Sequence, residues 1–256
     1  MLTPQMVWAF LLCLLFAFVM QIDANFVNDY FDFKKGTDRA DRLGPERACA
    51  QGWIRPEAMR RGIVVTTLAG CAVGLPLVWY GGWWMLAVGA LCVAGCILYT
   101  THLSYRGWGD ALVVVFFGFV PVFFTWWVVT APTGGVWVEV LLLGLAMGLA
   151  TDCLLMVNNY RDVEQDRLSG KRTLVVRFGE RSGRHAYLWL GIVAAAIVVS
   201  LHPKGVFVVL PYLLFHFQTY RLLCRLTGRE LNHVLGLTAR NIFLFGLLTA
   251  LIVLFF

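Results

Sequence analysis

Long runs without a single charged side chain alternate with short polar stretches along the whole chain. Residues 1–22, 62–105 and 111–138 contain no Asp, Glu, Lys or Arg. A helix needs about 20 apolar residues to cross the hydrocarbon core of a membrane. A barrel strand would alternate apolar and polar residues, whereas residues 111–120 are apolar at every position. The pattern therefore predicts an all-α, polytopic transmembrane helical bundle, formed by residues 1–256 as a single domain.

Glycine, proline and charge clusters divide the chain into candidate transmembrane helices. There are eight, at residues 2–28, 61–80, 83–100, 110–131, 137–160, 186–201, 205–222 and 238–256. Basic residues follow alternate connections: 20 of the 21 Lys and Arg lie in residues 33–61, 101–109, 161–185 and 221–240. Positively charged loops stay in the cytoplasm. We therefore expect a multi-pass protein of the cell inner membrane, with these loops on the cytoplasmic side and both termini outside.

Composition changes this picture little. The chain is 59% hydrophobic and 14% charged, whereas a soluble domain carries about 25% charged residues. Its net charge of +6 belongs to loops that set orientation, so we expect the lipid bilayer as a partner and no nucleic acid. The seven cysteines lie mostly in apolar runs and predict neither a disulfide nor a metal site. Gly144 and Gly148 predict a small-residue packing face. The oligomeric state stays open.

Acidic residues form two pairs at helix ends that the charge pattern assigns to the same side. Asp29 and Asp32 are three residues apart, and Asp162 and Asp166 are four apart, so each pair shares one helix face. Amides precede both pairs and basic residues follow both. Solvated helix ends are the simpler explanation. Repetition of the whole arrangement, however, favours hard-oxygen sites for Mg²⁺ that bridge a diphosphate, because paired carboxylates repel one another unless cations lie between them.

Residues 28–32 and 36–38, together with residues 158–174, resemble the two aspartate-rich motifs of the UbiA superfamily of intramembrane prenyltransferases. Further segments, at residues 42–47, 103–110, 171–174 and 177–179, are most similar to its menaquinone branch, the 1,4-dihydroxy-2-naphthoate polyprenyltransferases. Asp110 stands where many relatives have Glu. The resemblance implies nine transmembrane helices around a cavity open to the bilayer, so the chain is expected to begin at the family's second helix and to lack the first.

The implied reaction moves a polyprenyl group from polyprenyl diphosphate to an aromatic acid acceptor, 1,4-dihydroxy-2-naphthoate. CO₂ and diphosphate are released, and demethylmenaquinol is the product. The implied cofactor is Mg²⁺, as two ions. The implied catalytic residues are the four motif aspartates, Asp29, Asp32, Asp162 and Asp166.

The resemblance assigns further side chains to the ions and substrates. The metal ligands are the motif aspartates and two amides: Asn28, Asp29, Asp32, Asn158, Asp162 and Asp166. The diphosphate-binding residues are Asn28, Arg47, Asn159, Arg161, Lys171 and Arg172. Arg47 and Lys171 have an alternative role as determinants of topology.

The aromatic or prenyl groups are expected to meet Asp23, Asn25, Tyr105 and Tyr160. Asp23 and Asp152 lie inside apolar helices, where an ionised carboxylate costs about 2.5 kcal/mol or more. We therefore expect both to face the cavity.

Other functions stay open at this point. Another aromatic acceptor, of the 4-hydroxybenzoate or homogentisate type, would use the same motifs. A cation transporter would also carry carboxylates within the membrane, although it predicts them near mid-bilayer rather than grouped with basic residues at one interface. An inactive truncated homologue is the third alternative, because one family helix is expected to be absent.

Overall fold

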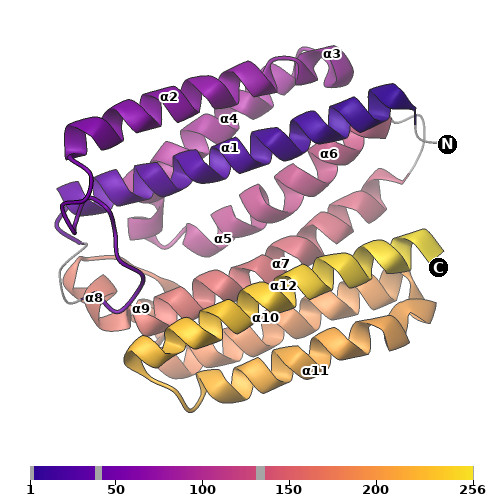
Figure 1. Cartoon of the computed structure of the whole chain (residues 1–256). Helices are drawn as coiled ribbons and strands as arrows, with labels where there is room; N and C mark the ends of the chain where they lie inside the picture. Colours follow the sequence, from indigo (N-terminus) through magenta and orange to yellow (C-terminus); the bar gives the residue numbers. More distant parts are fainter. Residues whose placement is uncertain (1–2, 38–41, 131–135, 256) are drawn as a thin grey trace. The chain divides into compact units, whose positions relative to one another are not determined.

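The computed structural model describes residues 3–37, 42–130 and 136–255. Within these ranges every regular element is helical (Figure 1). Eight helical segments are long and apolar enough to cross a membrane: Pro4–Lys34, Pro56–Gly81, Met85–Arg106, Gly109–Thr130, Trp137–Arg161, Glu180–Leu201, Pro203–Leu223 and Gly228–Phe255. The predicted all-helical transmembrane fold is confirmed. Asp38, Asp41 and the connection 132–135 lie outside the described residues.

The chain divides into two compact units, one of residues 1–103 and 121–135 and the other of residues 104–120 and 136–256. The first contains α1 (Pro4–Lys34), α2 (Pro56–Gly74), α3 (Leu77–Gly81), α4 (Met85–Leu98), the π-helical turn η1 (Tyr99–Leu103) and nearly all of α6 (Val120–Thr130). The second contains η2 (Ser104–Arg106), α5 (Gly109–Val114), η3 (Val115–Phe119), α7 (Trp137–Arg161), α8 (Val163–Leu168), α9 (Leu174–Phe178), α10 (Glu180–Leu201), η4 (Pro203–Gly205), α11 (Val206–Leu223), η5 (Gly228–Glu230) and α12 (Leu231–Phe255).

Helix α1 begins and ends at residues suited to those positions. The Thr3 hydroxyl accepts a hydrogen bond from the Met6 amide at 3.3 Å, and Pro4 occupies the first helical position, where its missing N–H costs nothing. Gly36 follows the helix with a φ of +69°, a conformation that glycine adopts without strain. The helix therefore runs to Lys34, beyond the predicted end near residue 28, and the first aspartate motif forms its last turns.

A buried carboxylate joins three helices of the first unit. Asp23 of α1 is fully buried. Its oxygens accept hydrogen bonds from Thr66 Oγ1 at 2.5 Å and from Thr67 Oγ1 at 3.1 Å, both on α2, and from Cys96 Sγ on α4 at 3.8 Å. Hydroxyl donors replace the water that this side chain loses on burial. The contacts favour a structural role for Asp23, and its expected contact with the aromatic or prenyl group stays a prediction.

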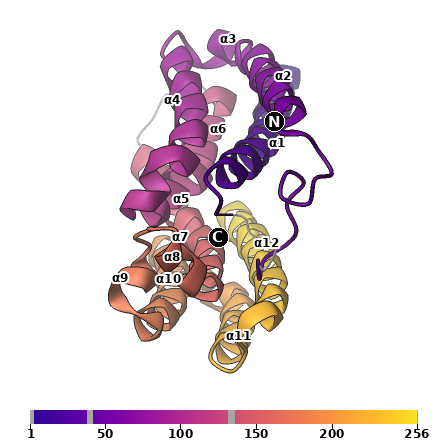
Figure 2. The same cartoon turned by 90° about the vertical axis from the view of Figure 1, so that its left-hand side faces the viewer.

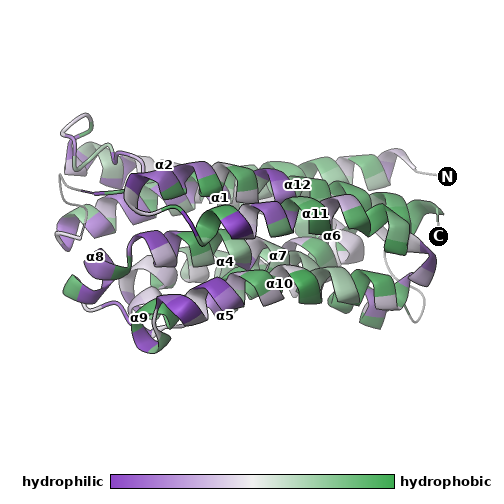
Figure 3. Cartoon of the chain, turned by 90° about the horizontal axis from the view of Figure 1, so that it is seen from below, coloured by the Kyte–Doolittle hydropathy of each residue, from purple (hydrophilic) through white to green (hydrophobic). Residues whose placement is uncertain are grey.

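In the second unit α7 is the central helix. It packs against α10, α12 and the α5–η3 segment, and α7, α10, α11 and α12 lie side by side in both views (Figures 1 and 2). Alanines at the contacts, including Ala146, Ala150, Ala194 and Ala195, are almost fully buried. Small side chains let helices approach closely in an apolar medium. Hydrophilic residues gather at the end of this unit that carries α8 and α9 (Figure 3).

A glycine crossing in the second unit brings α7 close to the α5–η3 segment. A methyl group added at Gly148 would lie 2.7 Å from the carbonyl oxygen of Val114, and one at Gly144 would lie 3.2 Å from the Cα atom of Phe119. The predicted packing face is confirmed. Because the residue numbers rise on one segment as they fall on the other, the two segments are antiparallel.

This crossing predicts a large effect from a small substitution. Gly148→Ala should lower the free energy of unfolding by about 1–3 kcal/mol, because backbone atoms cannot move aside as a side chain can. Gly236→Ala is the matched control, since a methyl group added at Gly236 of α12 meets no atom within 4 Å. Reversible unfolding in mixed micelles measures both. Equal stability of the two variants would contradict the close crossing.

Candidate active site

The first aspartate motif lies on the last turns of α1, where the chain folds back over the helix. Asp29 and Asp32 are both largely buried. The two Asp29 oxygens accept hydrogen bonds from the Ala48 amide at 2.8 Å and the Cys49 amide at 3.0 Å. Backbone amides are strong partners for an ionised carboxylate. Asp29 thus holds the loop after α1 in place, a contact that its spacing from Asp32 could not predict.

The Cys49 side chain reports the charge of this carboxylate. Burial and the neighbouring Asp29 carboxylate, which accepts a hydrogen bond from the thiol, raise the pKa of Cys49 to about 12. The thiol is therefore neutral at pH 7 and can donate this hydrogen bond to the Asp29 carboxylate.

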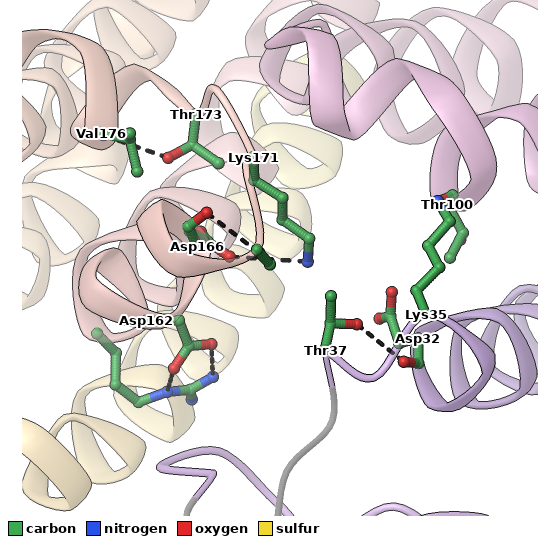
Figure 4. Close-up of polar contacts among 11 residues, drawn as sticks. Asp32, Lys35, Thr37, Thr100, Asp162, Asp166, Lys171, Thr173 and Val176 are labelled. Atoms are coloured by element: carbon green, nitrogen blue, oxygen red, sulfur yellow. Dashed lines mark hydrogen bonds and ion pairs between the residues drawn. The ribbon is translucent and has the colours of Figure 1, made fainter.

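Unlike Asp29, Asp32 has a buried side-chain oxygen that accepts no hydrogen bond from the described residues. Its backbone carbonyl accepts hydrogen bonds from the Thr37 amide at 3.0 Å and the Thr37 hydroxyl at 2.9 Å, which close the end of the helix (Figure 4). Its side-chain Oδ1 is buried and has no hydrogen-bond partner within the described part of the chain. A buried carboxylate oxygen without a donor fits a hard cation, so this residue suits the Mg²⁺ that the motif predicts.

Asn28 and Lys35 tie the motif to the end of α4. The Thr100 hydroxyl donates a hydrogen bond to Asn28 Oδ1. Lys35 Nζ donates to the carbonyl oxygens of Thr100 at 3.0 Å and Thr101 at 2.7 Å, both in the π-helical turn η1. Such turns leave carbonyl groups outside the regular helical pattern. Lys35, one of the basic residues that follow the first motif, therefore helps to hold that motif in place.

The second motif lies where α7 ends and α8 begins. Arg161, almost fully buried, donates from Nε and Nη2 to the two Asp162 oxygens at 2.8 and 2.6 Å and from Nη1 to Asn232 Oδ1 at 2.7 Å. A bidentate pair of this kind has a fixed geometry. It clamps Asp162 and connects α7 to α12. The predicted roles of Arg161 on the diphosphate and of Asp162 on a metal stay predictions.

Asp166, Lys171 and Tyr105, all predicted from the sequence, come together. Lys171 Nζ lies 3.7 Å from Asp166 Oδ1 (Figure 4). It also lies 5.5 Å from the centre of the Tyr105 ring. The backbone fixes this arrangement: the Lys171 amide donates to the Asp166 carbonyl at 2.9 Å, and the Arg172 amide donates to the Tyr105 carbonyl at 3.1 Å. This cluster presents one cation and one carboxylate at the end of the second unit.

The remaining predicted residues are more dispersed. Asn25 is exposed and donates to the Gln21 carbonyl of its own helix at 2.9 Å. Tyr160 is buried in an apolar cluster with Val175 and Tyr187, which favours packing over contact with a substrate. Asn159 is buried, whereas Asn158 and Arg47 are half-buried and Arg172 is exposed. None of these positions tests the binding roles that the sequence predicts.

Each unit carries one aspartate motif, which offers two carboxylates and one amide oxygen as possible metal ligands. Within the described ranges no three His, Cys, Asp or Glu side chains come together as a metal-binding group. Mg²⁺ commonly takes one or two protein carboxylates and completes its shell with water and substrate phosphates. The donor set in each motif therefore fits an ion that arrives with a phosphate, and Asp32 fits most directly.

Comparison with known proteins gives one consistent family. The family model for the UbiA prenyltransferase family matches residues 2–233. Similar proteins include the 1,4-dihydroxy-2-naphthoate octaprenyltransferases of Escherichia coli and Mycobacterium tuberculosis, each 36% identical to this chain over 75% of it and 65% of the relative. The human UbiA prenyltransferase domain-containing protein 1 is 26% identical over 88% of this chain and 69% of the relative.

A solved structure of digeranylgeranylglyceryl phosphate synthase supports the fold. It matches with a TM-score of 0.56 and 16% identity, over 96% of this chain and 90% of the other. At this identity the likeness concerns the fold alone. The match to residues 2–233 and the identities above establish the relationship by sequence. The chain belongs to the UbiA prenyltransferase family.

Proposed function

We propose that the protein transfers a polyprenyl group from polyprenyl diphosphate to 1,4-dihydroxy-2-naphthoate, with loss of CO₂ and diphosphate, to give demethylmenaquinol. The observation that carries the proposal is the 36% identity to proteins named as naphthoate octaprenyltransferases. The chain spans 65% of the length of these relatives, so the activity itself is what the experiment below tests.

The aspartate motifs provide the donor half of this reaction. Asn28, Asp29 and Asp32 would hold one Mg²⁺, and Asn158, Asp162 and Asp166 would hold another. When bound, such ions stabilise the charge that develops on a leaving diphosphate. Asp32 supports this assignment with its unpartnered buried oxygen. Asp29 keeps the loop over the helix end in place through its bonds to two amides.

Lys171 is the cation best placed for the diphosphate. It contacts Asp166 at 3.7 Å, a distance too long for a strong hydrogen bond, and it is only partly exposed. An anion bound beside Asp166 would therefore gain this cation without breaking a tight ion pair. Arg161 is less available, because Asp162 and Asn232 already engage its donors.

The membrane and its sidedness follow the same reasoning. The eight apolar helices found in the described part of the chain put the protein in the bilayer, where a polyprenyl tail is soluble. The alternating basic loops support a cytoplasmic position for both motifs. The inner membrane of the cell is the membrane that we propose.

The direct test supplies membranes containing the protein with dihydroxynaphthoate, a mixture of all-trans polyprenyl diphosphates and Mg²⁺. We expect prenylated naphthoquinol and CO₂ in equal amounts, both abolished by EDTA. Mass spectrometry identifies the product and its tail length. A product formed only from 4-hydroxybenzoate or homogentisate would reject naphthoate as the acceptor.

The metal ligands can be tested with a matched acidic control. Asp32→Asn and Asp166→Asn should each lower turnover on the order of 100-fold or more, since each removes a charged oxygen ligand. They should also weaken Mn²⁺ binding, measured by electron paramagnetic resonance. Glu164→Gln makes the same chemical change on α8, where the Glu164 side chain is exposed and paired with Arg167. Equal Mn²⁺ binding by all three variants would reject the assignment.

The role of Lys171 has its own control. Lys171→Gln should raise the KM for polyprenyl diphosphate about tenfold and leave the KM for the acceptor unchanged, because a charge-assisted contact to a phosphate oxygen is lost. Arg167→Gln removes the same charge nearby, but that side chain is exposed, so it should change neither constant. A similar rise in the donor KM for both variants would show that Lys171 acts only through the general positive charge.

A further inference from the structure

Three polar residues at the end of α1 share one face of the helix. Asn28, Asp32 and Lys35 follow one another at intervals of four and three residues, so they form a row that extends over about two helical turns. The first two belong to the helix, and Lys35 follows its last residue with a nearly helical backbone. The π-helical turn η1 packs against α1, and its hydrogen bonds reach both ends of this row.

Thr100 of η1 provides the contacts at both ends of the row. Its side-chain hydroxyl donates a hydrogen bond to Asn28 Oδ1, and its backbone carbonyl accepts one from Lys35 Nζ at 3.0 Å. Lys35 also donates to the Thr101 carbonyl at 2.7 Å. Asp32 lies between the two ends, and its buried Oδ1 accepts no hydrogen bond from the described residues. The turn thus holds the residues on either side of Asp32 and leaves that oxygen open.

The Thr100 hydroxyl is bonded differently from the hydroxyls of other threonines in the apolar helices. A threonine inside a helix commonly donates to the carbonyl one turn earlier in the same helix. This pattern is found at Thr101, Thr130, Thr151, Thr219 and Thr238. Thr100 is 3% exposed and donates across to α1 instead. Since a buried hydroxyl needs a partner, Asn28 is the residue that satisfies it within the described part of the chain.

Asn28 is the residue whose orientation this contact affects. An amide side chain can present either its oxygen or its NH₂ group to a ligand, and the oxygen is the atom that binds Mg²⁺. As a donor, the Thr100 hydroxyl holds Asn28 Oδ1 on the side of η1. An amide oxygen has two lone pairs, so Oδ1 can accept this bond and bind a cation at the same time. Partners of this kind orient the ligands of metal sites in proteins.

We propose that Thr100 is a positioning residue for the first aspartate motif: its hydroxyl orients the Asn28 amide oxygen as a Mg²⁺ ligand, and its carbonyl anchors Lys35 beyond Asp32. This inference rests on the metal site of the proposed function and does not depend on which aromatic acceptor is used. Thr100 acts through Asn28 and is not itself a ligand. Loss of its hydroxyl leaves the ligand atoms of the motif in place but lets the amide rotate, so the affinity for the ion falls.

Mn²⁺ binding to the purified protein, measured by electron paramagnetic resonance in the presence of inorganic diphosphate, tests this role. Thr100→Val removes the hydroxyl and keeps the shape of the side chain. It should weaken one of the two Mn²⁺ sites about 10- to 100-fold, the range for loss of a partner that orients a metal ligand. Thr100→Ser keeps the hydroxyl and should bind Mn²⁺ as the wild type does.

Thr101→Val is the matched control. It removes the same hydroxyl from the next residue, where the bond runs to the Ile97 carbonyl of the same helix at 2.8 Å. Its Mn²⁺ affinity should equal that of the wild type. Unfolding in mixed micelles under the same conditions confirms that each variant is folded. Equal Mn²⁺ affinity of Thr100→Val and Thr101→Val would overturn the proposal.

A double-mutant cycle shows whether Thr100 acts through Asn28. Asn28→Ala removes the side chain that receives the hydroxyl bond, so Thr100→Val should cause little further loss of Mn²⁺ affinity in that background. Purely additive losses would mean that Thr100 acts on the fold in general, and they would also overturn the proposal.

Turnover distinguishes a failure of this role from a failure of the proposed function. Membranes that make no prenylated naphthoquinol, while Mn²⁺ binding depends on Thr100 and Asn28 as described, would reject the acceptor and support the positioning role. Membranes that make the product equally well with the wild type and with Thr100→Val, at equal Mn²⁺ affinity, would reject the positioning role alone.

Discussion

A carboxylate inside an apolar protein must obtain its partners from the protein itself, and this requirement shapes both units. Water is not there to solvate it, and each unpaired oxygen costs free energy. Asp23 is satisfied by side-chain hydroxyls of a neighbouring helix. Asp29 is satisfied by two backbone amides, and Asp162 by an arginine beside it in the chain. Each of these sets of hydrogen bonds holds a different part of the backbone around the motifs in place.

Residues of one motif consequently divide into two roles. Some are occupied with holding the helix ends and loops, as Asp29 and Arg161 are, and others retain an oxygen or a cation for a ligand, as Asp32 and Lys171 do. The first group makes the second precise, because a ligand-binding side chain is only as well placed as the backbone that carries it. Asp29 combines both roles, because the proposed function also assigns it to the metal, so a substitution there is expected to disturb the loop as well as the ligand set.

Much of the fold was readable from the sequence because it depends on local properties. Runs of apolar residues are long enough only for helices, and the spacing of Asp29 and Asp32 places them on one face wherever the helix goes. The contacts between residues that lie on different helices or loops could not be predicted from the sequence. The bonds from Arg161 to Asp162 and Asn232 come from folding and not from spacing, and its predicted role on the diphosphate stays a prediction. The same holds for the bonds that Asp23 accepts from Thr66 and Thr67 of another helix. Spacing says which residues share a face, but not which helix or loop will cover it.

Helix α7 links packing to chemistry along one stripe of residues four apart. Gly144 and Gly148 bring the antiparallel α5–η3 segment close, and Asp152 follows on the same face, before the amides and Arg161 at the end of the helix. The glycines allow this approach because they carry no side chains that would keep the segments apart. The polarity of the helix rises toward the motif, so the helix that organises the core of this unit also carries the first residues of the second aspartate motif. Any change that separates α7 from the α5–η3 segment at these glycines would also shift the end of α7, so tight packing in the core helps to set the position of the second motif.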